Sequence, residues 1–113
     1  MVNQSYIPDR GHIVKLNFNP TQGHEQKGLR PAFVISPYEY NVKNSLALFM
    51  PITAQVKGYP FEVSLPLDLK TYGVILVDHI KSLDYKVRLI QFIEIVPEDV
   101  IQEVQAKIEV LIF

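Results

Sequence analysis

A carboxylate and a guanidinium lie five residues apart in a loop that two strand-like segments bracket. Glu25 and Arg30 belong to residues 11–37, GHIVKLNFNPTQGHEQKGLRPAFVISP, in which residues 12–19 and 31–36 read as strands. The planar fork of an arginine matches the oxygens of a phosphate, and a lysine does not reproduce this geometry. A nearby glutamate can act as a base or orient the arginine. Because catalytic groups often lie on loops held by rigid strands, we treat this loop as the candidate site.

A hydroxyl group outside this stretch is the second candidate. Thr53 ends the segment LALFMPIT at residues 46–53. Its hydroxyl can donate to the same phosphate if this strand lies beside the one that starts at Arg30. Simpler alternatives remain open, since Arg30 can pair with Glu25 and Thr53 can be an ordinary strand hydroxyl.

The sequence offers little for metal or thiol chemistry. It contains no cysteine, which excludes a disulfide, a thiolate metal site and a cysteine nucleophile. His12, His24 and His79 do not follow a metal-ligand spacing, so we expect surface or structural roles and no metal cofactor. An acid–base pair of His12 and His24 is an alternative.

Composition predicts one globular domain over residues 1–113. The chain is 48% apolar and 20% charged, and its net charge of −1 argues against nucleic-acid binding by bulk electrostatics alone. Residues 1–60 carry six basic and three acidic side chains, whereas residues 61–113 carry five and nine. This asymmetry permits a local anion-binding face, although chance explains it equally well. Without a signal segment or a membrane-spanning run, we expect a cytoplasmic protein with no membrane contact.

Short strands dominate the hydrophobic pattern and predict a mainly β, α+β fold with a strongly curved sheet or barrel. In residues 12–19, Leu16 and Phe18 share one face, while Lys15, Asn17 and Asn19 take the polar face. Further strands are expected in residues 31–36, 46–53, 61–65, 74–77, 79–83 and 87–96.

Individual strands differ in the environment they predict. Residues 32–35 are continuously apolar, as in a strand buried on both faces. Pro51 demands an edge position or a bulge for residues 46–53. Residues 87–96 read as one long bent strand, and residues 39–45 as a turn or short helix.

Only the C-terminal segment is clearly helical. Pro97 occupies a first-turn position, and Glu98 and Asp99 suit the positive end of the helix dipole. One apolar stripe recurs at three- and four-residue spacing through Val100, Ile101, Val104, Ile108 and Leu111. We expect this stripe to pack on the protein's own sheet in preference to a second subunit, although both can hold.

Several motifs occur in an order that resembles the MazF/PemK toxin family. Beside residues 11–36, the likeness rests on SPYEYN (36–41), PITAQ (51–55), KGYPFEV (57–63) and GVILVDHIKSLD (73–84). The resemblance implies a small SH3-like barrel of the MazF/CcdB/PemK type with peripheral helices and a C-terminal α-helix. It also implies a toxin of a type II toxin–antitoxin system, acting as a sequence-selective, metal-independent endoribonuclease.

The resemblance assigns roles to individual residues. Arg30 matches the catalytic arginine, Thr53 the strand-end threonine, and Glu25 a loop glutamate important in close relatives. Lys57 and Lys81 match positions implicated in RNA contact, and Gln55, Tyr59 and His79 complete the predicted RNA-binding set. Glycines on both sides of the loop would let it move over a substrate.

These residue types suit cleavage of RNA without a metal. The 2′-OH would attack the phosphorus, Glu25 would serve as base or orient Arg30, and Arg30 and Thr53 would stabilise the phosphorane. The products would be a 2′,3′-cyclic phosphate and a 5′-OH end. Single-stranded RNA is the expected substrate, because its unstacked bases are accessible. Tyr38, Tyr40 and Tyr59 are candidate stacking platforms, although structural tyrosines are commoner.

The family implies protein partners as well. We expect a homodimer and a MazE-like antitoxin whose acidic C-terminal tail enters the groove near Arg30 and competes with RNA. Contact with DNA would be indirect, through the toxin–antitoxin complex.

The chain departs from the family pattern at four positions. His12 stands where the family usually has an acidic residue after the first glycine, and Asn17 and Asn19 replace acidic residues around the first proline. His79 stands where relatives often have glutamine. The first three changes remove negative charge near the proposed site. Two alternatives to the endoribonuclease are a CcdB-like inhibitor of DNA gyrase, which acts through the C-terminal helix, and a homologue that binds RNA or antitoxin without cutting.

Overall fold

The computed structural model describes residues 6–19 and 28–113. Within these ranges the chain forms seven strands, two α-helices and two short 3₁₀ turns. In chain order these elements are β1 (His12–Asn17), β2 (Leu29–Val34), α1 (Tyr38–Asn41), β3 (Leu46–Thr53), β4 (Glu62–Ser64), β5 (Val74–Leu76), η3 (Val77–His79), β6 (Lys81–Asp84), η4 (Tyr85–Val87), β7 (Gln91–Ile95) and α2 (Glu98–Ile112).

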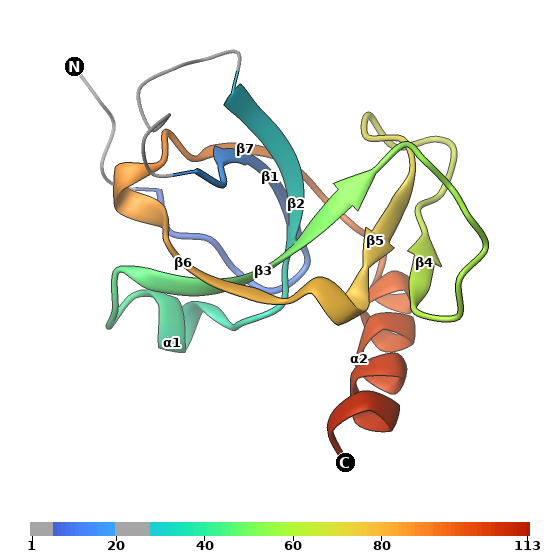
Figure 1. The fold of residues 1–113 in the computed structure, drawn as a ribbon. Coiled ribbons are helices and arrows are strands. Elements are labelled where there is room, and N and C mark those ends of the chain that lie inside the picture. The colour runs from blue at the N-terminus through green and yellow to red at the C-terminus, as the bar shows by residue number, and fades with distance from the viewer. Residues whose placement is uncertain (1–5, 20–27) are drawn as a thin grey trace.

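The strands form one antiparallel sheet with a branch. Its order is β4-β5-β3-β2-β1-β7, and β6 pairs with the first half of β3. Figure 1 shows β6 and β7 curving toward each other from opposite sides of β1, β2 and β3, with η4 between them. The central strands thus wrap into a barrel-like body, and the expected mainly β fold with a C-terminal helix is confirmed.

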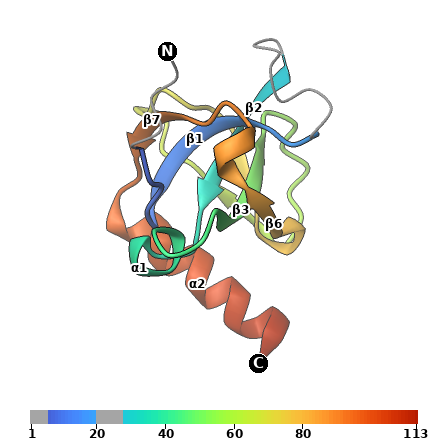
Figure 2. The ribbon, with the colours of Figure 1, turned by 90° about the vertical axis from the view of Figure 1, so that its left-hand side faces the viewer.

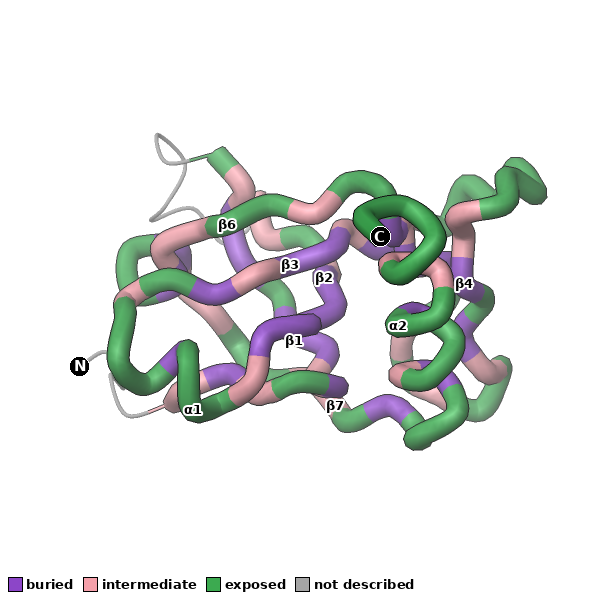
Figure 3. Tube along the Cα trace, turned by 90° about the horizontal axis from the view of Figure 1, so that it is seen from below, coloured by how far each residue is buried: buried purple, intermediate pink, exposed green. Residues whose placement is uncertain are grey.

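The central strands are buried on both faces, as the continuous apolar run in β2 predicted. Alternate side chains of β2 enter different cores. Phe33 packs in a core that the helix α2 covers, together with Ile13, Met50, Ile75, Val100 and Val104. Ala32 and Val34 pack in the second core, inside the barrel, with Val14, Leu16, Ala47, Phe49 and Tyr85. Figure 3 shows the resulting buried stretches along β1, β2 and β3.

Pro51 lies within a central strand, so the prediction of an edge position was wrong. On one side β3 pairs with β2, where Pro51 faces Ala32. On its other side β3 pairs with β6 as far as Phe49 and with β5 from Ile52 onward. Pro51 falls where the neighbour changes, which is a position that tolerates a residue without an N–H group.

Two further predictions about strands need correction. Asn17 was predicted to lie on a polar face, but it is fully buried. The segment after β6 covers it, and the backbone N–H of Asn17 donates to the Arg88 carbonyl in that segment (3.0 Å). The long strand expected over residues 87–96 is instead a 3₁₀ turn followed by the shorter β7. The buried Tyr85 anchors that turn, because its hydroxyl donates to the Asn41 carbonyl (2.7 Å).

The C-terminal helix follows the predicted pattern in its first half. Val100 and Val104 are buried against the sheet, so this part of the stripe packs on the protein's own sheet as expected. The second half extends beyond the sheet (Figure 2), and Phe113 is 97% exposed. No helix in the described ranges is both long and apolar enough to cross a membrane.

Candidate active site

Arg30 lies at the exposed start of β2, opposite Leu16 of β1. Because side chains alternate along a strand, Arg30 shares a face with Ala32 and Val34, which line the barrel core. Its Nη1 donates to the carbonyl of the preceding Leu29 (3.1 Å). The guanidinium is therefore presented at the end of the barrel core, on the surface.

The register of β2 and β3 relates Thr53 to this arginine. Ala32 faces Pro51, and the pairing ladder ends there. Continuing this register by two residues sets Thr53 opposite Arg30, on the same face of the sheet. Figure 1 shows the end of β3 running beside β5 instead, away from the start of β2. Arg30 and Thr53 thus flank the point where the two strands separate.

The end of β3 is held in place by close packing and by a local turn. Thr53 Oγ1 accepts a hydrogen bond from the backbone N–H of Gln55 (3.1 Å). Gly73 approaches so closely that a Cβ atom there would lie 2.1 Å from the Thr53 carbonyl oxygen. With a φ of +128°, Gly73 also has a backbone conformation that other residues rarely adopt. The candidate hydroxyl is therefore positioned by the contact between β3 and the start of β5.

The loop that follows Thr53 presents several of the predicted RNA-binding residues. We call residues 54–61 the β3–β4 loop; all of them except Phe61 are exposed, including Gln55. Within it the Lys57 ammonium lies 5.8 Å from the centroid of the Tyr59 ring, which is within the range of a cation–π interaction. Tyr59 is 61% exposed, so it is free of the core and can present a ring face to a ligand.

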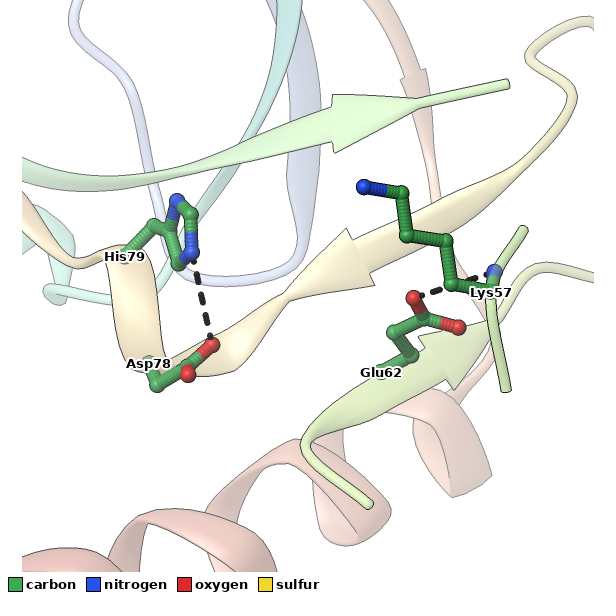
Figure 4. A network of polar contacts seen from close by, with 4 residues as sticks. All are labelled: Lys57, Glu62, Asp78 and His79. Carbon is green, nitrogen blue, oxygen red and sulfur yellow. Dashed lines mark hydrogen bonds and ion pairs between the residues drawn. The ribbon is translucent and has the colours of Figure 1, made fainter. Parts of the chain in front are cut away.

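His79 and Lys81 lie apart from Arg30 within one chain. Lys81 is exposed on β6 and faces Phe49, four residues before Thr53 on β3. This separation corresponds to about 13 Å along the strand. His79 is exposed in η3, with its Nε2 3.8 Å from Asp78 Oδ1 (Figure 4). Lys81 therefore lies apart from Arg30 and Thr53, and His79 precedes it in η3.

Two predictions concern the segment between β1 and β2. Glu25 and His24 fall outside the described residues, as does the expected movement of the loop that contains them. In the described ranges, no group of three or more histidine and acidic side chains is arranged to hold a metal ion. The chemistry that can be built from described residues is therefore that of Arg30, Thr53 and the exposed β3–β4 loop.

Sequence reasoning missed one residue of this surface, Glu62. Its carboxylate accepts hydrogen bonds from two consecutive backbone N–H groups, those of Lys57 (3.2 Å) and Gly58 (2.9 Å). Gly58 has a φ of +77°. A glycine in a polar turn followed four residues later by an acid was the available signal, but it is common in turns that have no function.

The chain resembles known proteins both in sequence and in fold. Residues 9–112 match the model of the PemK-like, MazF-like toxins of type II toxin–antitoxin systems. The chain belongs to this family. This membership, with relatives named as endoribonucleases, favours an endoribonuclease over a CcdB-like gyrase inhibitor.

Individual members of the MazF-like family are similar over nearly their whole length. The Escherichia coli K12 protein named endoribonuclease toxin MazF is 44% identical over 107 residues, covering 95% of this chain and 96% of its own. A crystal structure of MazF from Deinococcus radiodurans is 48% identical, with a TM-score of 0.84 over 95% of this chain and 97% of its own. A MazE–MazF crystal structure from the same organism is 44% identical, also with a TM-score of 0.84, over 95% and 96% of the two chains.

His12, which departs from the MazF-like pattern, has a structural role. Its Nδ1 accepts a hydrogen bond from the Tyr6 hydroxyl (2.8 Å), and the ring packs edge-on against Phe92. Burial raises the pKa of Tyr6 well above its usual range, which keeps the hydroxyl protonated as the donor. Burial also lowers the pKa of His12, an effect that the charge of Asp9 partly opposes. A neutral imidazole thus ties the N-terminal segment to β1 and β7.

This arrangement predicts a loss of stability in mild acid. As the pH falls, His12 is protonated at a higher pH in the unfolded chain than in the folded chain, because its folded pKa lies below the usual value of about 6.5. The contribution of His12 is therefore complete above that value and declines as the pH falls toward the folded pKa. Urea unfolding at pH 7.5 and 5.5 should show a larger drop for the wild type than for His12→Asn. The matched variant His79→Asn, at an exposed ring, should retain the wild-type drop.

Proposed function

We propose that this MazF-like toxin is an endoribonuclease that cleaves single-stranded RNA by attack of the 2′-OH, without a metal ion. Membership of the family and the names of its relatives support the activity. The observation that carries the mechanism is the β2–β3 register, which relates Thr53 to Arg30 across the point where the strands separate.

Arg30 supplies most of the transition-state stabilisation in this mechanism. Its guanidinium donates to two phosphate oxygens as negative charge develops on the phosphorane, and the Thr53 hydroxyl donates to the same group. Glu25 acts as the base that deprotonates the 2′-OH or orients Arg30. The 5′ oxygen then departs and takes a proton from water, which leaves a 2′,3′-cyclic phosphate and a 5′-OH end.

The remaining candidates hold the RNA chain on either side of the scissile phosphate. Lys57 contacts the backbone, and Tyr59 stacks on an unpaired base, as exposed aromatic rings do in single-strand recognition. Gln55 offers a donor and an acceptor for base edges, and His79 and Lys81 bind farther along the strand. Base contacts determine which RNA sequence this surface selects, and phosphate contacts contribute most of its affinity.

Cleavage mapped in the absence of metal tests this proposal. Purified protein is incubated with a long single-stranded RNA in excess EDTA, and the cleaved ends are identified by phosphatase and kinase treatment. We expect cuts at a small set of related sequences, each leaving a 5′-OH. A DNA copy of the target should bind and remain intact, since it lacks the nucleophile. Intact RNA after prolonged incubation would contradict the endoribonuclease proposal and leave a binding protein as the alternative.

A MazE-like antitoxin is the expected protein partner, in the cytoplasm. MazE–MazF complexes of a relative support such a pairing. An acidic tail of that partner would accept the same donors from Arg30 and Lys57 that RNA uses, so inhibition and catalysis would exclude each other. Contact with DNA would then arise only through the complex.

The protein is further proposed to act as a homodimer. The end of α2 and the terminal residue place four consecutive apolar side chains in solvent, Val110, Leu111, Ile112 and Phe113. Beside them lies a groove of about 450 Å³ lined by Ile35, Leu48, Ile80, Ile108 and Ile112, with Arg10 and Glu109 among its polar residues. Contiguous exposed apolar side chains beside an apolar groove favour a subunit interface.

Placing a charge in this patch should separate the subunits. Ile112→Asp is expected to shift the protein from dimer to monomer in sedimentation velocity at micromolar concentration, because the interface would bury an unpaired carboxylate. Leu67→Asp, at an apolar residue that is 87% exposed in another loop, should leave the dimer intact. A wild-type protein that sediments as a monomer would contradict this part of the proposal.

A further inference from the structure

The β3–β4 loop is closed by a side chain from the strand that follows it. Glu62, the first residue of β4, turns its carboxylate back to the loop. One oxygen accepts from the Lys57 N–H (3.2 Å) and the other from the Gly58 N–H (2.9 Å). The backbone N–H of Glu62 in turn donates to the Tyr59 carbonyl (3.1 Å). The carboxylate and the backbone N–H of Glu62 therefore both hold the loop between Lys57 and Tyr59.

The backbone of the loop is suited to a negative group at this point. Successive N–H groups form a concave anion-binding nest when a residue with negative φ precedes one with positive φ, and Gly58 has a φ of +77°. A carboxylate that spans two such N–H groups makes charge-assisted hydrogen bonds. Glu62 thus acts as an internal anion for the loop backbone.

The Lys57 side chain is not used by this contact. Figure 4 shows that the Glu62 carboxylate meets the backbone nitrogen of Lys57, while the ammonium group points away from it. The ammonium lies instead 5.8 Å from the Tyr59 ring centroid. The carboxylate therefore orients a cation and an aromatic ring together without neutralising the cation in an ion pair.

A second contact ties the same loop to the C-terminal helix. Lys107 of α2 donates from its ammonium group to the Pro60 carbonyl. The loop is thus held at Lys57 and Gly58 by β4 and at Pro60 by α2. Lys57 and Tyr59 are the two residues proposed to contact RNA. Lys57 is itself one of the held residues, and Tyr59 lies between Gly58 and Pro60.

We propose that Glu62 is a positioning residue for RNA binding, which presets Lys57 and Tyr59 in the loop that follows Thr53. This inference rests on the proposed function. Glu62 touches no substrate atom and acts through the backbone of the loop. A preset loop lowers the conformational entropy lost on binding, so Glu62 increases affinity for RNA although it adds a negative charge to an RNA-binding surface.

Substitutions at Glu62 separate positioning from charge. Glu62→Gln removes the negative charge and replaces one acceptor oxygen with an NH₂ group. Glu62→Asp keeps the charge but is one methylene too short to reach both N–H groups. Positioning predicts that both variants raise the KM for RNA by about tenfold with little change in kcat, since charge-assisted hydrogen bonds of the loop are lost. Simple electrostatics predicts instead that Glu62→Gln lowers the KM and Glu62→Asp leaves it unchanged.

A double-mutant cycle identifies the residue through which Glu62 acts. Lys57→Ala should raise the KM in the wild-type background and have a much smaller effect in Glu62→Asp, because the misplaced ammonium contributes little there. Glu103→Gln, a loss of one exposed carboxylate on α2, controls for net charge and should retain the wild-type KM. Urea unfolding of each variant verifies the fold, and the affinity of a target with a 2′-deoxy scissile residue gives binding without cleavage.

These experiments test positioning by Glu62 separately from the endoribonuclease activity. If the wild type cleaves RNA while both Glu62 variants keep the wild-type KM and affinity, positioning by Glu62 is wrong and the endoribonuclease proposal stands. Additive effects in the cycle would equally overturn it. If the wild type does not cleave, the proposed function fails, and the affinity for the 2′-deoxy target still tests whether Glu62 presets an RNA-binding loop.

Discussion

Arg30→Ala is expected to lower the single-turnover rate of RNA cleavage by about a hundredfold to a thousandfold. The variant loses the donors that stabilise the phosphorane, while binding through the β3–β4 loop remains. The exposed position of Arg30 at the start of β2 makes a loss of stability small, because no apolar core depends on it. Quenched single-turnover assays in EDTA, with protein in excess over a short target RNA, measure this rate directly.

Arg30→Lys is the informative companion variant. A lysine keeps the positive charge but cannot donate to two phosphate oxygens from one plane. We therefore expect its rate to stay near that of Arg30→Ala while its affinity for a 2′-deoxy target approaches the wild-type value. A lysine variant with wild-type cleavage would show that only charge matters, and an alanine variant with full activity would exclude Arg30 from catalysis.

Gly73→Ala is expected to destabilise the fold by about 3 kcal/mol. Two independent effects act at this position. A Cβ atom would lie 2.1 Å from the Thr53 carbonyl oxygen, and the φ of +128° is unfavourable for any side chain. The end of β3 would have to move away from β5, so the loss of stability should be accompanied by loss of cleavage even at temperatures where the variant is folded. Urea unfolding and cleavage assays on the same sample measure both.

Gly58→Ala provides a matched control. Gly58 also has a positive φ, of +77°, but apart from its two chain neighbours no residue has an atom within 4 Å of the position that a Cβ would occupy. Only the unfavourable positive φ remains, so we expect Gly58→Ala to lower the free energy of unfolding by about 1 kcal/mol. Equal losses for the two variants would mean that the close approach to Thr53 contributes nothing and that β3 can shift freely.

The elements that the sequence predicted best are those with an unambiguous local pattern. The helix α2 begins at Glu98, and Glu98 and Asp99 lie in its first turn as expected, although Pro97 is the N-cap residue and not part of the first turn. The continuous apolar run in β2 indicated burial on both faces, and its residues fill two cores. In these cases the hydrophobic pattern and the tertiary environment agree, so local reasoning was sufficient.

Predictions failed where a residue's environment depends on distant chain segments. Asn17 is polar and was placed toward solvent, yet the turn containing Arg88 covers it. Pro51 was predicted to require an edge position or a bulge, because nothing in the local sequence reveals that β3 changes its neighbour from β6 to β5 at that point. Each outcome is decided by packing between segments that are more than twenty residues apart in sequence.

In the candidate site, too, some features follow from residue type and others from tertiary packing. The sequence by itself determined the chemistry, since a guanidinium, a hydroxyl and a lysine–tyrosine loop are matched to phosphate and bases whatever their arrangement. Only the tertiary structure decided that the β2–β3 ladder ends two residues short of Arg30 and Thr53 and that Glu62 holds the loop. It also decided that Lys81 pairs with Phe49, about 13 Å along β3 from Thr53. Functional groups are a property of residue type, whereas their distances follow from strand register and loop closure, which depend on contacts throughout the sheet.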